Sequence, residues 1–321
     1  MRVLSVDAGT SFIKAALAEV DGELKIVDYL NIPVETRSPE PLAYEHDPRE
    51  VVGSVVKLLK HYSRFKPDAV SLSTYLFGFV AVDEELRPLT GILTWQDERA
   101  TAVLKQLKPY AQELYRRTGC PPLHIYTLPK LLWLKQKRRG IFERARAFLD
   151  AKSLLLSALA GEVVTDLSTA SGTYQLLNVH SLRWDDLALE VAGVNESALP
   201  RLAEGDAIAT LRGRVASETG LEGVQLVLGV YDGGSTVFGL TGRRRDRASA
   251  NSSWATDGLH RCGPLGSLPR YDRRGHTATG EEEVRLAQPT RWGPNSEALF
   301  TTESLALQGG EEVGKTPNPL S

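Results

Sequence analysis

The stretch Val3-Leu4-Ser5-Val6-Asp7-Ala8-Gly9-Thr10-Ser11-Phe12-Ile13-Lys14 decides the fold of this chain. It predicts a strand, a tight polar turn and a second strand, because an apolar run ends at an acid and a glycine. The backbone N–H groups of such a turn can face a phosphate. The Asp7 carboxylate suits hydrated magnesium, which prefers carboxylate oxygen and keeps several waters. An ordinary hairpin explains the same string, so both interpretations stay open at this point.

The segments that follow predict an α/β domain. Residues 23–30 predict a third strand after the Asp21-Gly22 turn, so antiparallel strands open the domain. Asp47 and Pro48 predict the cap and first turn of a helix with a buried face. Residues 68–73 and 91–95 predict strands that end in polar clusters, and open α/β sheets bind ligands at strand ends. The pattern from residue 110 to residue 160 is helical.

Composition excludes several classes of function. The chain has 321 residues, of which 42% are hydrophobic and 24% charged, with a formal net charge of -2. These values predict a soluble chain of one large or two ordinary domains that binds a small molecule, not nucleic acid. The start of the chain lacks a signal-peptide pattern and no apolar stretch is long enough for a membrane span, so we expect a cytoplasmic protein. The 2 cysteines do not suggest a disulfide framework or a zinc site.

A second acid follows a later apolar run. Residues 224–230 predict a buried strand that ends at Tyr231-Asp232-Gly233-Gly234. In isolation Asp232 is more simply a turn residue before a glycine pair. Together with Asp7 it favours a pair of acids at strand ends that face one ligand.

The loop at Asp7 resembles the first phosphate loop of the actin, heat-shock-70 and sugar-kinase superfamily. Residues 1–242 resemble the FGGY carbohydrate kinases, chiefly the gluconokinase-like and xylulokinase-like members. The likeness rests on an ordered set of motifs: Asp7-Ala8-Gly9-Thr10 with Lys14, Leu93-Thr94-Trp95-Gln96-Asp97-Glu98-Arg99, Thr127-Leu128-Pro129-Lys130-Leu131-Leu132-Trp133, Val164-Thr165-Asp166-Leu167-Ser168-Thr169-Ala170-Ser171 and Gly229-Val230-Tyr231-Asp232-Gly233. The resemblance implies an actin-like ATPase (ribonuclease H-like) domain with a mixed sheet, on the sugar side of a two-domain kinase.

The resemblance also implies an activity and a set of site residues. It implies phosphorylation of a sugar or sugar-acid hydroxyl that depends on ATP and Mg2+, with Asp232 as general base. Asp7 would orient the magnesium. The residues that would bind the nucleotide's phosphates are Asp7, Gly9, Thr10, Ser11 and Lys14.

The implied sugar contacts are Thr74, Tyr75, Trp95 and Asp97, because an aromatic wall with a carboxylate suits a polyhydroxylated ligand. Core packing by Trp95 is the alternative. Lys130 and Trp133 match a family motif, but their spacing is also that of a helix with one packed and one solvated face. Tyr75 and Phe77 replace residues of xylulose- and gluconate-directed members, which leaves the sugar open.

The composition changes after Gly242. Residues 243–321 are rich in Arg, Gly, Pro, Ser and Thr, which predicts a poorly structured, degenerate tail in place of an ATP-binding domain. A frameshifted second half is one hypothesis for its origin. Residues 309–316 match G-x-x-x-x-G-K-[ST], but Pro317 and Pro319 block a following helix, so we predict no nucleotide site there. Residues 243–247 are interpreted as a solvated basic cluster.

The sequence therefore supports a leading hypothesis and an alternative. The first is a carbohydrate kinase whose activity in this chain is open, because the ATP half is missing. The second is a non-catalytic sugar-binding or interaction module on an actin-like domain. A homodimer or a separately encoded C-terminal half are the partners that would complete a kinase.

Overall fold

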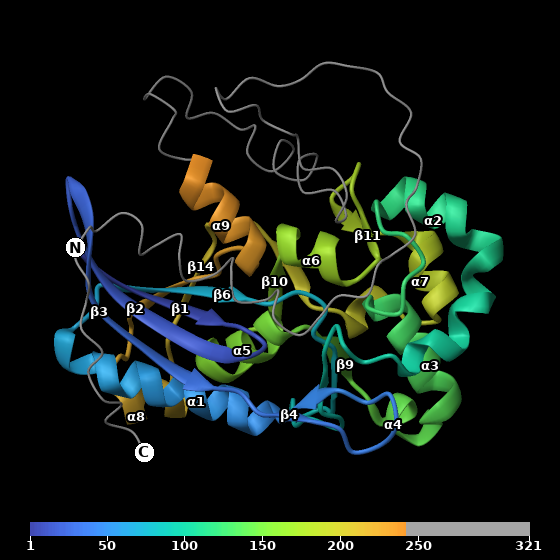
Figure 1. The fold of residues 1–321 in the computed structure, drawn as a ribbon, viewed down its shortest axis with the longest axis horizontal. Helices are drawn as coiled ribbons and strands as arrows, with labels where there is room; N and C mark the ends of the chain where they lie inside the picture. The colour runs from blue at the N-terminus through green and yellow to red at the C-terminus, as the bar shows by residue number, and fades with distance from the viewer. Residues whose placement is uncertain (242–321) are drawn as a thin grey trace. The chain divides into compact units, whose positions relative to one another are not determined.

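A mixed sheet of six strands positions the functional residues in this computed structural model, which describes residues 1–241. The strand order is β14-β15-β6-β1-β2-β3 (Figure 1). Its strands are β1 (Arg2–Ala8), β2 (Phe12–Asp21), β3 (Glu23–Pro33), β6 (Ala69–Thr74), β14 (Ile208–Thr210) and β15 (Gln225–Val227). The strands β1, β2 and β3 pair antiparallel, whereas β6 runs parallel to both β1 and β15. The predicted antiparallel opening and the mixed sheet are confirmed.

The first hairpin separates a buried face from a polar face. Leu4 and Val6 of β1 and Ile13 and Ala15 of β2 are buried, and they alternate with less buried residues as strand geometry requires. Asp7 lies on the opposite face, because it has the other parity along β1. The register places it directly across from Lys14.

Three helices cover the buried face of the sheet (Figure 1), and they are α1 (Pro48–Tyr62), α5 (Ala151–Ala160) and α8 (Gly213–Thr219). Helix α1 begins as predicted, since the Asp47 side chain accepts a hydrogen bond from the Arg49 N–H at 2.8 Å and Pro48 is its first residue. Its apolar stripe is Val51, Val55, Leu58, Leu59 and Tyr62, all buried.

A second hydrophobic core lies among the helices that follow β6 in the chain. These helices are the 3-10 helix η2 (Arg99–Tyr110), α2 (Ala111–Thr118), α3 (Thr127–Lys137), α4 (Arg139–Arg144), α6 (Leu167–Thr173) and α7 (Asp186–Ala192). Leu131 and Leu134 of α3 pack there with Phe148 and Trp184. The predicted helical character of residues 110–160 is confirmed, with one short strand inserted before α5.

The remaining elements are short strands and two short 3-10 helices, η1 and η3. They are β4 (Thr36–Arg37), β5 (Glu45–His46), η1 (Ser63–Phe65), β7 (Val80–Val82), β8 (Ile92–Leu93), β9 (Ala147–Leu149), β10 (Val164–Asp166), β11 (Leu177–Asn178), β12 (Arg183–Trp184), η3 (Glu196–Ala198) and β13 (Arg201–Ala203). Helix α9 (Asp232–Thr241) ends the described part of the chain.

The predictions for the tail, for residues 243–247 and for the motif at 309–316 lie outside the described residues. The domain boundary at Gly242 stays a prediction for the same reason. Within residues 1–241, no helix is both long and apolar enough to cross a membrane.

Candidate functional site

Three parallel strands end side by side and bring the predicted acids to one edge of the sheet. The register pairs Asp7 of β1 with Ser73 of β6, and Ala8 with Thr74. Beyond β15 the chain makes a further parallel bridge between Thr74 and Tyr231, the residue before Asp232. Because the carboxyl ends of adjacent parallel strands share an edge, ligands bind there in open α/β sheets. We call the residues at this edge, from Asp7 across Thr74 to Asp232, the acid edge.

Asp7 carries a carboxylate oxygen that protein groups leave unsatisfied. Its Oδ2 lies 3.8 Å from Nζ of Lys14, whereas its buried Oδ1 has no hydrogen-bond partner among the described residues. Burial raises the pKa of Asp7, and the Lys14 charge and the Ser73 hydroxyl oppose this rise. Buried polar atoms are nearly always paired, so this oxygen is an acceptor with capacity for a ligand. It fits the needs of a hydrated magnesium ion, which a single carboxylate and several waters can hold.

The turn after Asp7 has room for glycine alone at its first position. A Cβ on Gly9 would lie 2.9 Å from the carbonyl oxygen of Phe12, closer than real Cβ contacts allow. That carbonyl accepts a hydrogen bond from the Gly9 N–H at 3.0 Å. Thr10 is half-buried and Ser11 exposed, so both hydroxyls are near solvent. The hairpin and the phosphate-cradle interpretations are therefore compatible, since the same turn serves both.

Asp232 is the first residue of helix α9, so the interpretation of Asp232 as a simple turn residue, which applied to it in isolation, does not hold. Cβ atoms on Gly233 and Gly234 would lie 3.0 and 3.1 Å from the ring of Tyr231. The close approach of this ring requires small residues in the first helical turn, although glycine costs about 1 kcal/mol relative to alanine in a helix. The glycine pair therefore reflects packing, and local sequence could not distinguish it from a turn signal.

The carboxyl group of Asp232 is electrostatically coupled to that of Asp7. Burial raises the pKa of Asp232. The Gly233 N–H donates a hydrogen bond to Oδ1 of Asp232 at 2.7 Å, which opposes this rise. The Asp7 charge raises the pKa of Asp232 further. The coupling requires the two acids to be near one another. A carboxylate with a raised pKa in such a pair is suited to accept a proton.

The predicted sugar contacts of β6 are buried. Thr74 has no exposed surface, and its Oγ1 has no hydrogen-bond partner among the described residues. The Tyr75 hydroxyl lies 3.0 Å from Nδ1 of His46, inside the protein. Burial lowers the pKa of His46 to about 4, so its ring is neutral at physiological pH. Tyr75 thus has a structural partner, whereas Thr74 has spare hydrogen-bonding capacity.

Trp95 and Asp97 lie in different environments although only two residues separate them. Trp95 is 38% exposed, so the core-packing alternative does not describe it. Asp97 has no exposed surface, and its Oδ2 accepts hydrogen bonds from Arg99 and from the Tyr44 N–H at 3.1 Å. The Trp95 ring can reach a ligand directly. A direct role of Asp97 toward a sugar stays a prediction.

Arg99 is the centre of an ion-pair cluster that the sequence did not reveal. Its guanidinium binds the carboxylates of Asp97, Glu40 and Glu45, and lies 4.5 Å from the centroid of the Trp133 ring. Burial alone would lower the pKa of Arg99, but these carboxylates raise it, so the charge is permanent. Glu40 and Glu45 are more than fifty residues away in the chain, which is why no local motif marks them.

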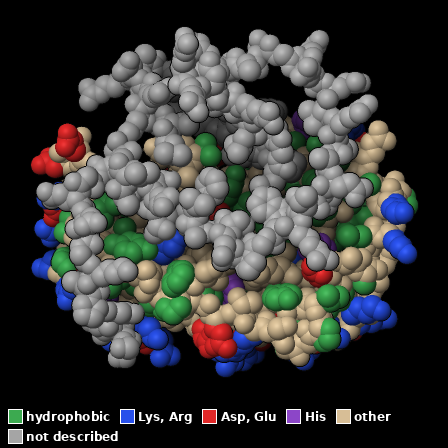
Figure 2. Space-filling model, viewed as in Figure 1, with side chains coloured by type: hydrophobic (Ala, Val, Ile, Leu, Met, Phe, Trp, Pro, Cys, Tyr) green, Lys and Arg blue, Asp and Glu red, His purple; other side chains and the backbone are tan. Residues whose placement is uncertain are grey.

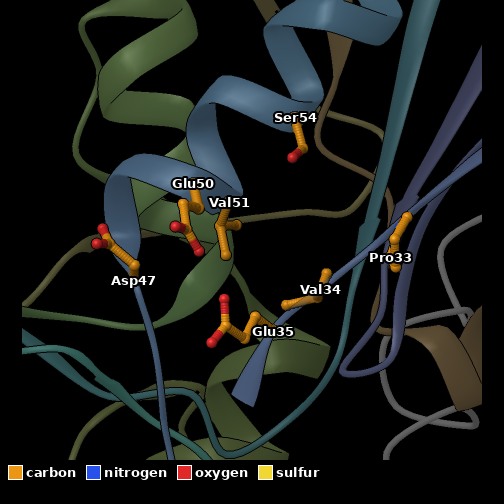
Figure 3. Close-up of a pocket in the computed structure, with 7 residues that line it drawn as sticks. All are labelled: Pro33, Val34, Glu35, Asp47, Glu50, Val51 and Ser54. Carbon is orange, nitrogen blue, oxygen red and sulfur yellow. The ribbon is translucent and has the colours of Figure 1, made fainter. Parts of the chain in front are cut away.

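Two hollows lie away from the acid edge. One of about 330 Å³ is lined by Gln106, Tyr110, Leu132, Glu190 and Val191. The other, of about 20 Å³ between the end of β3 and α1, has room for one water (Figure 3). Of its three acids, Asp47 and Glu50 are paired with Arg37. Residues 1–241 contain no group of three side chains arranged to hold a metal ion. On the face drawn in Figure 2, side chains of both charge signs lie around the periphery of the described part.

The fold and the acid edge together define an actin-like α/β domain with paired acids at a strand edge. The chain belongs to the FGGY family of carbohydrate kinases, because residues 2–239 match the N-terminal domain of that family. The predicted fold class is confirmed by solved structures. The xylulose kinase of Lactobacillus acidophilus is 26% identical, with a TM-score of 0.71 over 74% of this chain and 50% of that one.

The curated proteins that this chain resembles are also carbohydrate kinases. The gluconokinase of Bacillus subtilis (strain 168) is 29% identical over 206 residues, which are 62% of this chain and 40% of the relative. The xylulose kinase of Escherichia coli (strain K12) is 27% identical over 308 residues, or 94% of this chain and 61% of the relative. The chain spans about half the length of the relatives it matches.

Proposed function

We propose that this chain provides the sugar-binding and base-carrying half of a kinase that transfers a phosphoryl group from ATP to a hydroxyl of a sugar or sugar acid. The observation that carries the proposal is the acid edge, where Asp7 near the end of β1 and Asp232 after β15 lie on either side of β6, and where the Asp7 charge contributes to the raised pKa of Asp232. Membership of the FGGY family supports the reaction class.

Asp232 acts as the general base in this proposal. Its carboxylate accepts the hydroxyl proton as the sugar oxygen attacks the γ-phosphorus, while the bond from that phosphorus to the β-γ bridging oxygen breaks and ADP leaves. Burial and the Asp7 charge raise the pKa of Asp232, which brings it nearer the operating pH of a base. Lys14, which faces Asp7 across the hairpin, supplies positive charge for the transferred phosphoryl group.

Magnesium and ATP are the implied cofactors. Oδ1 of Asp7 would accept hydrogen bonds from water on the ion, which neutralises charge on the phosphates when bound. The Gly9–Ser11 turn would place backbone N–H groups and the hydroxyls of Thr10 and Ser11 toward the phosphates. A solved relative, the glycerol kinase of Plasmodium falciparum, contains ADP, and it is 21% identical to this chain.

The sugar is proposed to lie between Trp95 and Thr74. The exposed Trp95 ring provides an apolar wall for the C–H face of a sugar, and the unsatisfied Oγ1 of Thr74 provides a hydrogen bond. Tyr75 binds His46, and Asp97 binds Arg99. In the proposal these two contacts hold in place the segments that contact the sugar.

A second candidate function is a sugar-binding or interaction module without catalysis. The observation that favours it is that residues 2–239 match the N-terminal domain of the family. In the kinase proposal a separately encoded half or a second copy of the chain contributes further nucleotide contacts. In the module proposal none is needed.

Calorimetric titration separates the two functions. The full chain is titrated with a panel of sugars and aldonic acids and, separately, with ATP and magnesium. Sugar binding together with ATP binding that Asp7→Asn abolishes supports the kinase. Asp21→Asn, at the far end of the same hairpin, is the matched control and should leave ATP binding intact. Sugar binding without ATP binding, both by the chain alone and together with any second half that completes it, supports the module, and binding of neither ligand contradicts both.

A further inference from the structure

The side chain of Lys130 is buried without an ion-pair partner among the described residues. It belongs to α3, has no exposed surface, and donates to three backbone carbonyl oxygens. Nζ lies 2.6 Å from the oxygen of Phe77, 2.9 Å from that of Thr94 and 3.4 Å from that of Leu93. An ammonium group has three protons to donate, so each carbonyl can receive one.

The three carbonyls belong to the two segments that carry the proposed sugar contacts. Thr74 and Tyr75 precede Phe77, and Trp95 and Asp97 follow Thr94. The segments also pair directly, because Phe79 and Leu93 exchange backbone hydrogen bonds of 3.0 and 2.8 Å. Lys130 therefore links the two segments through hydrogen bonds to residues that lie next to the proposed sugar contacts.

Phe77 adopts a backbone conformation that needs such support. Its φ is 65°, in the left-handed region that side chains other than glycine rarely adopt. Thr173 Oγ1 accepts a hydrogen bond from the Phe77 N–H at 3.2 Å, while Lys130 binds the carbonyl. A conformation of this kind persists when surrounding groups fix it, and such positions concentrate at ligand sites.

A lysine is a costly residue for helix packing at this position. Its neighbours on α3, Leu128, Leu131 and Leu134, fill the same core with apolar side chains. Burial lowers the pKa of Lys130 to about 7. The charge of Asp97 opposes this decrease, and the charge of Arg99 adds to it. His124 also interacts electrostatically with Lys130. Burying a charge carries a large desolvation cost, which apolar packing alone does not require. The spacing of Lys130 and Trp133 also allowed a helix with one packed and one solvated face, but residues 127–134 of α3 are all buried.

We infer that Lys130 is a positioning residue that fixes the segment at Phe77 against the segment at Trp95, so that the sugar-binding surface is formed before the sugar arrives. It does not touch the reacting groups. The role assigned to the surface rests on the proposed function, whereas the mechanical link between the two segments does not.

Hydrogen exchange on the ligand-free full chain tests the link. In Lys130→Met, the amides of Phe77, Phe79, Leu93 and Asp97 are expected to exchange faster, because the carbonyls of their segments lose a shared donor. Lys152→Met is the matched control, since Lys152 is equally buried but pairs with Asp166 at 2.5 Å. It should destabilise the fold and leave the relative exchange of these four amides unchanged.

Sugar affinity gives the second readout. Lys130→Met is expected to weaken sugar binding about tenfold, as for loss of a hydrogen bond to a charged group. Lys152→Met, compared under conditions where it is fully folded, should bind sugar normally. Equal exchange and equal sugar affinity in the two variants would overturn the inference.

Two outcomes remain distinguishable from failure of the inference. If the unmodified chain binds no sugar, the proposed function fails and the exchange comparison alone decides the role of Lys130. If Lys130→Met does not fold, Lys130→Gln replaces it, because its amide is polar but shorter and has two donors, so at least one of the three carbonyls loses its donor. Faster exchange confined to the two segments supports the inference, and unchanged exchange contradicts it.

Discussion

The acid edge and the cluster around Arg99 differ in whether their buried polar groups have hydrogen-bond partners. At the acid edge, Asp7 Oδ1 and Thr74 Oγ1 have no hydrogen-bond partners among the described residues. In the cluster, the carboxylates of Asp97 and Glu45 are bonded to Arg99. Fully satisfied networks hold a shape, whereas unsatisfied acceptors are available to a ligand. In the proposed function, the Arg99 cluster positions the segments that contact the sugar, and the acid edge receives the reactants.

The first prediction concerns the cluster and has the largest effect on stability. Arg99→Met leaves Asp97 buried without its main partner, so the free energy of unfolding should fall by about 3–5 kcal/mol. Urea unfolding measures the loss. The matched control is Arg87→Met, because Arg87 also pairs with two carboxylates but its side chain is 70% exposed. The control should lose far less stability, because its ion pairs are exposed to solvent, and equal losses in both variants would contradict the comparison.

The second prediction concerns Tyr75, whose hydroxyl has a partner in the interior. Tyr75→Phe leaves a ring nitrogen of His46 unpaired, which should lower the free energy of unfolding by about 1–2 kcal/mol. Thermal or urea unfolding tests this against Tyr110→Phe, in which an exposed tyrosine loses its hydroxyl. A loss of sugar affinity without a loss of stability would instead place the Tyr75 hydroxyl in direct contact with the sugar.

The third prediction concerns Asp7 and has the smallest effect on stability. Asp7→Asn should change the free energy of unfolding by less than about 1 kcal/mol at neutral pH, because among the described residues the carboxylate has one weak ion pair with Lys14 and an interaction with the Ser73 hydroxyl. Since burial raises the folded-state pKa of Asp7, its contribution to stability is present below its unfolded value near 3.8. It is lost as the pH rises through the folded value.

Unfolding curves measured from pH 3.5 upward test the sign of this linkage. The unmodified chain should lose stability relative to Asp7→Asn just above pH 3.8, and the difference should level off once Asp7 is ionised in the fold. A relative gain over the same range would mean that Asp7 is stabilised as a carboxylate by protein groups. That result would remove the contrast between the two regions.

The sequence predicted those parts of the molecule that depend on local pattern. The apolar run that ends at Asp7 and Gly9 predicted the hairpin, and acids after apolar runs predicted the acid edge, because the sequence marks where an apolar strand ends. The partners of Arg99 and Lys130 could not be predicted, since Glu40 and the carbonyl of Phe77 are more than fifty residues distant in the chain from the groups that they contact. The helix at Asp232 was missed because packing against Tyr231 explains the glycines that locally indicate a turn.

The most direct test of the account is sugar-phosphate formation from ATP and magnesium by the full chain, alone and with any second half that completes it. Asp232→Asn should reduce the rate by about 10²–10⁴-fold, as for loss of a general base, with sugar affinity little changed. Asp206→Asn, an exposed acid, should have no effect. Turnover that survives Asp232→Asn would contradict the assignment of the base and, with it, the function proposed for the acid edge.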